Sequence, residues 1–117
     1  MKINSSKINK WIEPEFLAHY LASKFGEEGL AWLDSDGCEN GEYSYLGLNP
    51  KKVIFTNTKD FDLDNPFERL NEIKEGFWMG WLSYEAGAWL EPKNSWHKPE
   101  ISTLWIASYD PIIKFNL

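Results

Sequence analysis

Turn-forming residues divide this chain into a string of short segments, and this feature limits its fold more than any other. Gly26 closes the first segment, Asn49-Pro50 separates two later ones, and Asn65-Pro66 opens another. Glycine interrupts regular structure through its conformational freedom, and proline does so because it lacks a backbone N–H. The fold must therefore be assembled from small elements.

Two of these segments carry the signals of helices. The first covers residues 14–25, where Pro14 stands at a tolerated first position and Gly26 suits the C-terminal cap. The second covers residues 65–74, where Asn65 can cap the N-terminus. The apolar residues expected to share a face are Phe16, Leu17, Tyr20, Leu21 and Phe25 in the first helix, and Phe67, Leu70 and Ile73 in the second.

The remaining apolar segments predict strands. They cover residues 30–35, 43–50, 53–58, 77–90 and 103–117. Gly80 would let another backbone or a bulky ring approach closely, and Pro111 implies a bulge or an edge position in the last strand. The order α-β-β-β-α-β-β predicts an α+β fold with a largely antiparallel sheet and two short helices. With no linker or repeat in the sequence, residues 1–117 are expected to form a single domain.

Composition and charge narrow the classes of protein further. The chain is 43% hydrophobic and 16% aromatic, which is enough apolar surface for a globular core. Its net charge is -6 and its longest basic run is Lys51-Lys52, so nucleic acid is not an expected partner. It has neither a secretory signal nor the roughly 20 apolar residues that span a bilayer. The lone Cys38 cannot form an internal disulfide, and the chain is expected to be cytoplasmic.

The acidic turn DSDGCENGE suggests a calcium loop at first. Asp34, Asp36 and Asn40 supply oxygen ligands at close spacing. However, Glu39 stands where the loop pattern needs glycine, and Tyr45 stands where it needs the bidentate glutamate. We therefore expect a solvated hairpin turn at this position.

The other reactive residues do not form a catalytic set. His19 and His97 lack partners at metal-ligand spacing and are expected at the surface. Cys38 has no recognisable histidine partner or helix N-terminus that would activate it. Glu85 and Asp110 lie on different predicted strands and do not suggest an acid/base pair. Residue chemistry alone thus predicts neither a catalytic nor a metal site.

Four segments of the chain stand out together: WLDS at 32–35, YSYLGLNP at 43–50, GFWMGWLSYEAG at 76–87 and TLWIASYD at 103–110. They resemble the start of component I of the aminodeoxychorismate and anthranilate synthases. That family has an L-x-E/D/H-S tetrapeptide followed by a Y/R-S-Y/R-hydrophobic-G-x-x-P stretch, then G-G-x-x-G-Y-x-S-Y-E and P-D-x-W/A-x-x-x-Y-D segments. The four segments occur in the family's order across nearly the whole chain.

Some positions depart from the family pattern. Phe77 replaces the second glycine of the pair, Trp81 replaces the usual tyrosine, and Pro99-Glu100 are set back from the final strand. These departures affect local geometry. The W/A-x-x-x-Y-D strand favours the aminodeoxychorismate branch, which leads to para-aminobenzoate and folate, over the anthranilate branch of tryptophan biosynthesis.

The resemblance implies a parent enzyme that aminates chorismate. Such enzymes use ammonia from a glutamine amidotransferase partner and hold the substrate carboxylates through magnesium. The catalytic and magnesium motifs belong to a chorismate-binding domain downstream, so we expect this segment to hold no cofactor and to be inactive alone. The apolar pattern IIKFNL at 112–117 stops without a polar tail, which suggests truncation before that domain.

The resemblance also implies half of a tryptophan pocket. Its residues here would be Leu33, Asp34, Ser35, Tyr43, Ser44, Tyr45 and Leu46. Asp34 or a backbone carbonyl can meet an ammonium, serine hydroxyls can orient polar groups, and a tyrosine can flank an indole. The alternative is that these residues only pack a hairpin around a turn.

Functions of other classes stay open. An aromatic-rich binding module would expose coplanar aromatic rings as a platform for carbohydrate or peptide. The family resemblance instead predicts that four aromatic residues are mostly buried or lie at an interface with the absent domain. These are Phe77, Trp78, Trp81 and Trp105. A stand-alone remnant with a scaffolding role is the third possibility.

Overall fold

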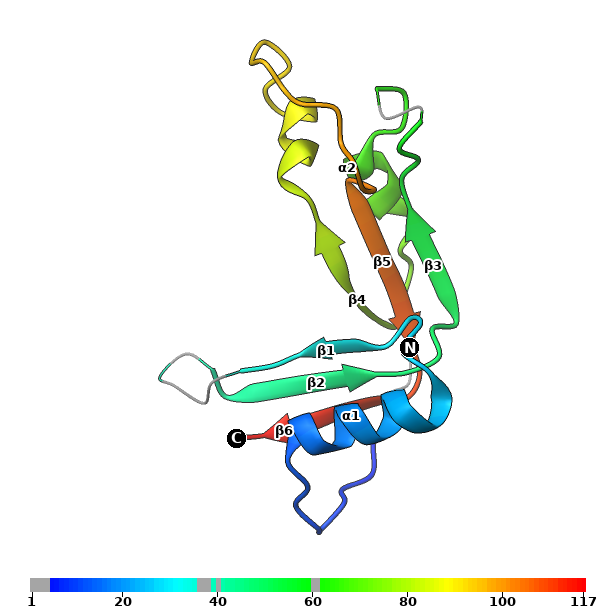
Figure 1. Cartoon of the computed structure of the whole chain (residues 1–117), viewed down its shortest axis with the longest axis vertical. Helices are drawn as coiled ribbons and strands as arrows, with labels where there is room; N and C mark the ends of the chain where they lie inside the picture. The colour runs from blue at the N-terminus through cyan, green and yellow to red at the C-terminus, as the bar shows by residue number, and fades with distance from the viewer. Residues whose placement is uncertain (1–4, 36–38, 40, 60–61) are drawn as a thin grey trace. The chain divides into compact units, whose positions relative to one another are not determined.

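The structure is a computed structural model that describes residues 5–35, 39, 41–59 and 62–117. These residues form two antiparallel sheets of three strands each and a few short helices, which confirms the α+β class (Figure 1). In chain order the elements are α1 Pro14–Phe25, β1 Ala31–Leu33, β2 Tyr43–Gly47, β3 Lys52–Phe55, α2 Pro66–Arg69, the 3-10 helix η1 Leu70–Glu72, β4 Phe77–Leu82, the 3-10 helix η2 Tyr84–Trp89, β5 Leu104–Tyr109 and β6 Ile112–Asn116. The chain divides into two compact units, residues 1–50 with 109–117 and residues 51–108. That residues 1–117 act as one N-terminal domain stays a prediction.

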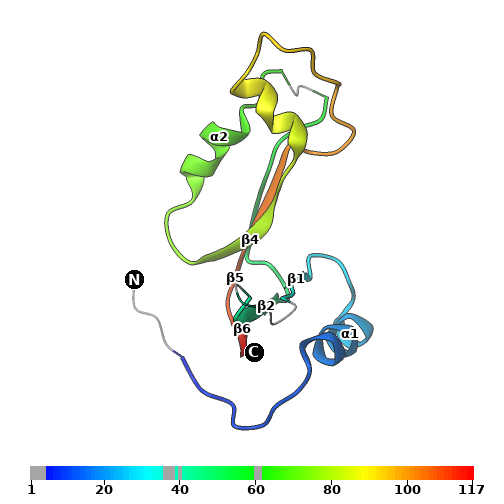
Figure 2. The same cartoon turned by 90° about the vertical axis from the view of Figure 1, so that its left-hand side faces the viewer.

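The first unit is a sheet in the order β1-β2-β6 with helix α1 along one face (Figure 2). Both strand pairs are antiparallel, and Tyr45 lies opposite Leu33 on one side and Lys114 on the other. The core between helix and sheet is built on Ala18, Leu46 and Phe115. Partly buried side chains that pack against it are Leu17, Leu21, Leu30, Trp32 and Ile113. This packing buries the α1-facing side of β2.

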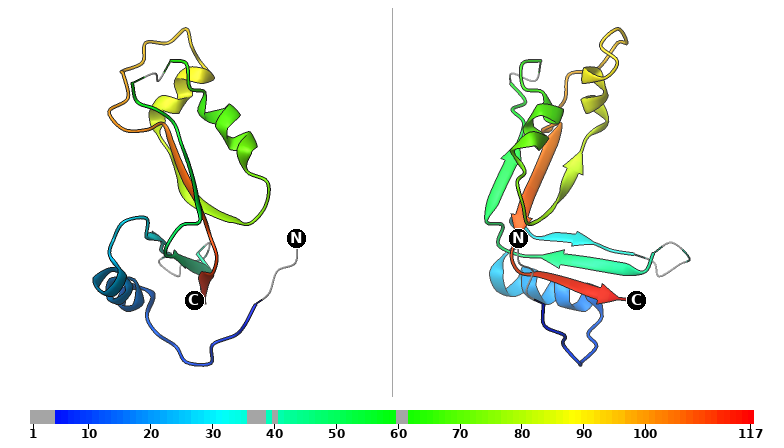
Figure 3. Two further views of the ribbon diagram at one scale, coloured as in Figure 1. Left: turned by 90° about the vertical axis from the view of Figure 1, so that its right-hand side faces the viewer. Right: turned by 180° about the vertical axis from the view of Figure 1, so that it is seen from behind.

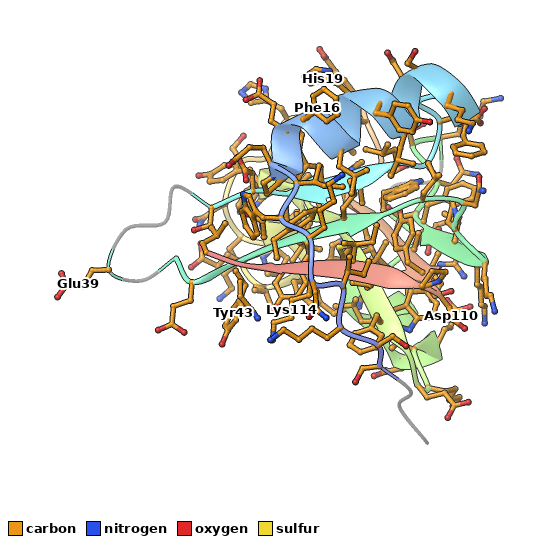
Figure 4. All side chains as sticks on the ribbon, turned by 90° about the horizontal axis from the view of Figure 1, so that it is seen from below. Phe16, His19, Glu39, Tyr43, Asp110 and Lys114 are labelled. Carbon is orange, nitrogen blue, oxygen red and sulfur yellow. The ribbon has the colours of Figure 1, made fainter. Side chains whose placement is uncertain are left out.

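Helix α1 has the predicted bounds but buries a different face from the one expected. Pro14 and Ala18 are buried, whereas Phe16 is 67% exposed and lies on the outer side of the helix (Figure 4). Tyr20 and Phe25 are exposed as well. The reason is geometric: apolar residues surround more than one face of this helix, and a sheet can cover only one. The predicted apolar face was therefore wrong at these three aromatic residues.

The second unit is a sheet in the order β3-β5-β4, with β5 in the centre (Figure 3). The predicted close approach at Gly80 is confirmed, since a Cβ there would overlap the Trp105 carbonyl oxygen and lie 2.5 Å from the Cα of Ile106. The Asn65 cap is confirmed too, because its side-chain oxygen accepts a hydrogen bond of 2.9 Å from the Phe67 N–H. The helix that it caps is shorter than predicted: α2 ends at Arg69 and continues only as η1.

Two predicted strands were too long. The stretch 77–90 is a strand only to Leu82, because β5 begins at Leu104 and offers no partner beyond the bond from the Ser83 N–H to the Thr103 carbonyl. Residues beyond Ser83 satisfy their N–H groups locally in η2. The stretch 103–117 is two strands in different sheets, β5 and β6, separated by a cis Asp110-Pro111 peptide. Since proline cannot donate to a strand ladder, pairing ends there, and neither a bulge nor a continuous edge strand forms.

Tyr109 is a buried anchor of the first unit, and its replacement by phenylalanine is expected to lower the free energy of unfolding by about 1–3 kcal/mol. Its hydroxyl donates a 2.6 Å hydrogen bond to the Gly29 carbonyl oxygen, which the variant would leave unpaired. Urea denaturation at neutral pH measures the loss. Tyr84→Phe, at a side chain that is 84% exposed, is the matched control and should change little.

Ionisation of Tyr109 is expected to destabilise the fold at alkaline pH. Desolvation by burial raises the pKa of Tyr109 above its ordinary value of 10.0. The folded state therefore keeps the phenolic proton to a higher pH than the unfolded state does. The contribution of Tyr109 to the free energy of unfolding is complete below pH 10.0, and it is lost as the pH rises through the pKa of Tyr109 in the folded state. Urea denaturation from neutral to strongly alkaline pH should show a smaller decline in Tyr109→Phe than in the unmodified chain. Parallel declines would contradict the assignment.

Candidate functional site

The predicted pocket residues lie where β1 and β2 run side by side and at the end of β1. Leu33 closes β1 and lies opposite Tyr45 of β2. Asp34 and Ser35 follow β1 directly, so the antiparallel pairing brings them beside the start of β2. Two segments that are separated by the acidic turn in the sequence are thus neighbours in the fold.

A small hydrogen-bond network joins these two segments. The Ser44 hydroxyl donates to Asp34 Oδ1 at 2.9 Å and accepts from the Ser35 N–H at 3.0 Å. Ser44 is completely buried, whereas the Asp34 residue is exposed. One carboxylate oxygen is therefore held by a buried hydroxyl while the carboxylate stays within reach of a ligand. Such a carboxylate can accept a hydrogen bond from an ammonium group.

The predicted pocket residues lie on two different faces of the sheet. Ser44 and Leu46 are buried on the side that α1 covers. Successive side chains of a strand point to opposite faces, so Tyr43 and Tyr45 lie on the other side together with Leu33. Leu33 and Tyr43 are exposed there. The structure thus gathers the three residues Leu33, Tyr43 and Tyr45 on an open face, and it brings Asp34, Ser35 and Ser44 together at the strand ends.

Lys114 belongs to this open face and was missed in the sequence. Its Nζ lies 3.9 Å from the centre of the Tyr43 ring, and Figure 4 shows the two side chains together. Tyr43 and Tyr45 have ring centres 6.4 Å apart. An ammonium over an aromatic face is attracted by the ring quadrupole. The one sequence signal for Lys114 was that it is a single charged residue in the apolar run IIKFNL. The sequence does not show, however, which strand pairs with that run.

Other residues considered in the sequence take no part in this network. His19 and His97 are exposed, as predicted, and His19 Nε2 lies 4.0 Å from a Glu15 oxygen. Asp36, Cys38 and Asn40 fall outside the described residues. Within the described part of the chain, no group of three or more His, Cys, Asp or Glu is placed to hold a metal ion. No helix in that part is long and apolar enough to cross a membrane.

The four aromatic residues that were expected to be mostly buried are not buried within this chain. Phe77 and Trp81 are exposed, and Trp78 and Trp105 are half-buried. The Trp78 indole N–H donates to the Glu75 carbonyl oxygen at 2.8 Å. The other part of that expectation, that these four residues lie at an interface with a further domain, stays a prediction.

Comparison of the chain with models of protein families, with curated proteins and with solved structures finds no match in any of the three. The candidate site consists of a buried serine that joins Asp34 to Ser35 and of an open face with two tyrosines and a lysine.

Proposed function

We propose that this chain is the N-terminal regulatory and structural segment of an aminodeoxychorismate synthase component I. Support comes from the four segments that resemble the family, which form coherent elements here. The segment WLDS includes the end of β1, YSYLG is its partner strand β2, FWMGWL is β4, and LWIASY is β5. Anthranilate synthase component I is the alternative within the same family.

The observation that carries this proposal is the network of Asp34, Ser35 and Ser44. It joins the two segments whose counterparts in the family flank a tryptophan molecule. A ligand amino acid at this point could place its ammonium at Asp34 and its indole against Tyr43 or Tyr45. In our proposal a loop from a further, chorismate-binding domain completes the pocket.

The proposed parent enzyme works with two further components. A glutamine amidotransferase subunit would supply ammonia, and magnesium in the chorismate-binding domain would hold the substrate carboxylates. The family resemblance places magnesium in that domain, and in our proposal no step of the reaction takes place on this chain. We place the enzyme in the cytoplasm.

Tryptophan binding tests the proposed pocket. Calorimetry should detect L-tryptophan binding to a chain extended through its chorismate-binding domain. Ser35→Ala removes the hydroxyl that is proposed to orient the ligand but keeps the N–H bonded to Ser44, and it should weaken binding by about 1–3 kcal/mol. The 117-residue chain should bind poorly, because the ligand would stay half solvated. Ser23→Ala, at an exposed position of α1, is the control and should leave the affinity unchanged. Equal affinity in the extended protein and its Ser35→Ala variant would remove the pocket from the proposal.

The chain alone is expected to be inactive towards chorismate. Incubation with chorismate, ammonia and magnesium, followed by chromatography, should give no aminated product above the rate without protein. The physical reason is that the proposal places all acid/base and metal groups in the further domain. Any product that depends on this chain would contradict the proposal.

An aromatic-rich binding module is the second candidate, because Trp81 and Phe77 of β4 are exposed, and so is Phe55 of β3. Exposed aromatic side chains on one sheet can stack on sugar rings or peptide side chains. Glycan and peptide arrays distinguish the two functions. Binding that Trp81→Ala abolishes would favour the module, whereas tryptophan binding to the extended protein would favour the enzyme segment.

A further inference from the structure

The second unit contains a small pocket that no step of the proposed function uses. It has a volume of about 220 Å³, and most of its lining residues come from η2, the loop 91–100 and the segment before α2. Its lining includes Asp62, Glu85, Trp89, Trp96 and His97. Because pockets for drug-sized ligands occupy roughly 300–1,000 Å³, this one suits a smaller molecule.

One aromatic wall of the pocket is held in place by its surroundings. The Trp96 indole N–H donates a 2.9 Å hydrogen bond to the Glu91 carbonyl oxygen. The ring packs so tightly against Gly87 that a Cβ there would lie 2.5 Å from its Cη2 atom. The Tyr84 ring lies 5.4 Å away, centre to centre. The indole is therefore positioned before any ligand binds, which lowers the entropic cost of binding.

Two negatively charged side chains line the pocket. Asp62 and Glu85 are its carboxylates, and among the described residues that line it there is no lysine or arginine. Within the described part of the chain, neither carboxylate has an ion pair or a side-chain hydrogen bond. Two uncompensated carboxylates create a negative potential that a cation can neutralise. A neutral or anionic ligand would gain nothing from them.

We propose that this pocket binds a small organic cation with a methylated ammonium head. Indole rings attract such groups through their π faces, and the indole side chains of Trp89 and Trp96 both line the pocket. The carboxylates of Asp62 and Glu85 add charge attraction without a metal-like cluster. The pocket lies wholly within residues 51–108, so the proposal does not depend on the tryptophan site.

The experiment titrates the full chain with choline and, separately, with its neutral isostere in which carbon replaces the ammonium nitrogen. Each of the seven tryptophans should give one indole N–H signal in a proton–nitrogen NMR spectrum, and Trp96→Phe identifies the signal of Trp96 by its loss. Choline should shift that signal in a saturable way. The isostere should bind at least about tenfold more weakly, since it lacks both the cation–π attraction and the charge attraction.

Two charge variants complete the test. Glu85→Gln keeps the shape of the side chain and should raise the dissociation constant of choline about two- to fivefold. Glu68→Gln removes an identical charge from an exposed position of α2 outside the pocket and should change nothing. The proposal is overturned by equal binding of choline and its isostere, by an unmoved Trp96 signal, or by equal effects of the two variants. None of these outcomes bears on tryptophan binding, so the two proposals can fail separately.

Discussion

Replacing Leu46 by alanine is expected to lower the free energy of unfolding by about 2–5 kcal/mol. Leu46 is only 1% exposed and lies in the core between α1 and the sheet, in contact with the group formed by Ala18 and Phe115. Removing its isobutyl group would lose the burial energy and leave a cavity that the surrounding strands can fill only in part. Because small domains are stable by about 5–15 kcal/mol, the variant should unfold at much lower urea concentration.

Leu63→Ala is the matched control for this prediction. The same chemical change is made there at a side chain that is 81% exposed, so the free energy of unfolding should stay within about 0.5 kcal/mol of that of the unmodified chain. Tryptophan fluorescence and circular dichroism follow both variants. If the two substitutions cost the same, Leu46 is not the core residue of this sheet.

Gly80→Ala is expected to destabilise the second sheet by about 3 kcal/mol or more, at the upper end of what overpacking costs. The added Cβ would overlap the Trp105 carbonyl oxygen and approach the Cα of Ile106, and both atoms belong to the backbone of the central strand β5. A flexible side chain could move aside, but a paired central strand cannot do so without losing hydrogen bonds. Thermal unfolding and amide hydrogen exchange in β5 measure the effect.

Leu82→Ala serves as the control in the same strand, since Leu82 is half exposed and its truncation adds no atom. It should cost well under half as much as Gly80→Ala and leave the exchange protection of β5 nearly unchanged. Normal stability in Gly80→Ala would mean that the close approach between β4 and β5 is absent.

Features encoded by neighbouring residues could be predicted from the sequence. The bounds of α1 follow from Pro14 and Gly26, the N-terminus of α2 from Asn65, and the close approach from Gly80. Each depends on the dihedral preference or the size of one residue and its immediate neighbours. The α+β class follows in the same way, because the type of each element is set mainly by local pattern.

In the candidate site, the family resemblance grouped Leu33, Asp34 and Ser35 with Tyr43, Ser44, Tyr45 and Leu46, and the pairing of β1 with β2 brings the two segments together. The sequence did not predict that alternation along β2 sends Ser44 towards α1 and Tyr43 to the open face. It also missed Lys114, which is 71 positions from Tyr43 by the difference of their numbers and reaches its ring only through the pairing of β2 with β6. Pairing over such a distance depends on the folding of everything between the two strands.

The sequence by itself thus determined where elements begin, which residues cap them and at which position a side chain cannot be accommodated. The tertiary structure decided which face of α1 is buried, since Phe16 and Phe25 are exposed although they are as apolar as the residues that the sheet covers. It also decided that the final apolar run is shared between two sheets, β5 in one and β6 in the other. The physical reason is that burial and strand pairing are set by the nearest surface in space. Hydrophobicity indicates only that a residue can be buried, and the partner that buries it comes from a distant part of the chain.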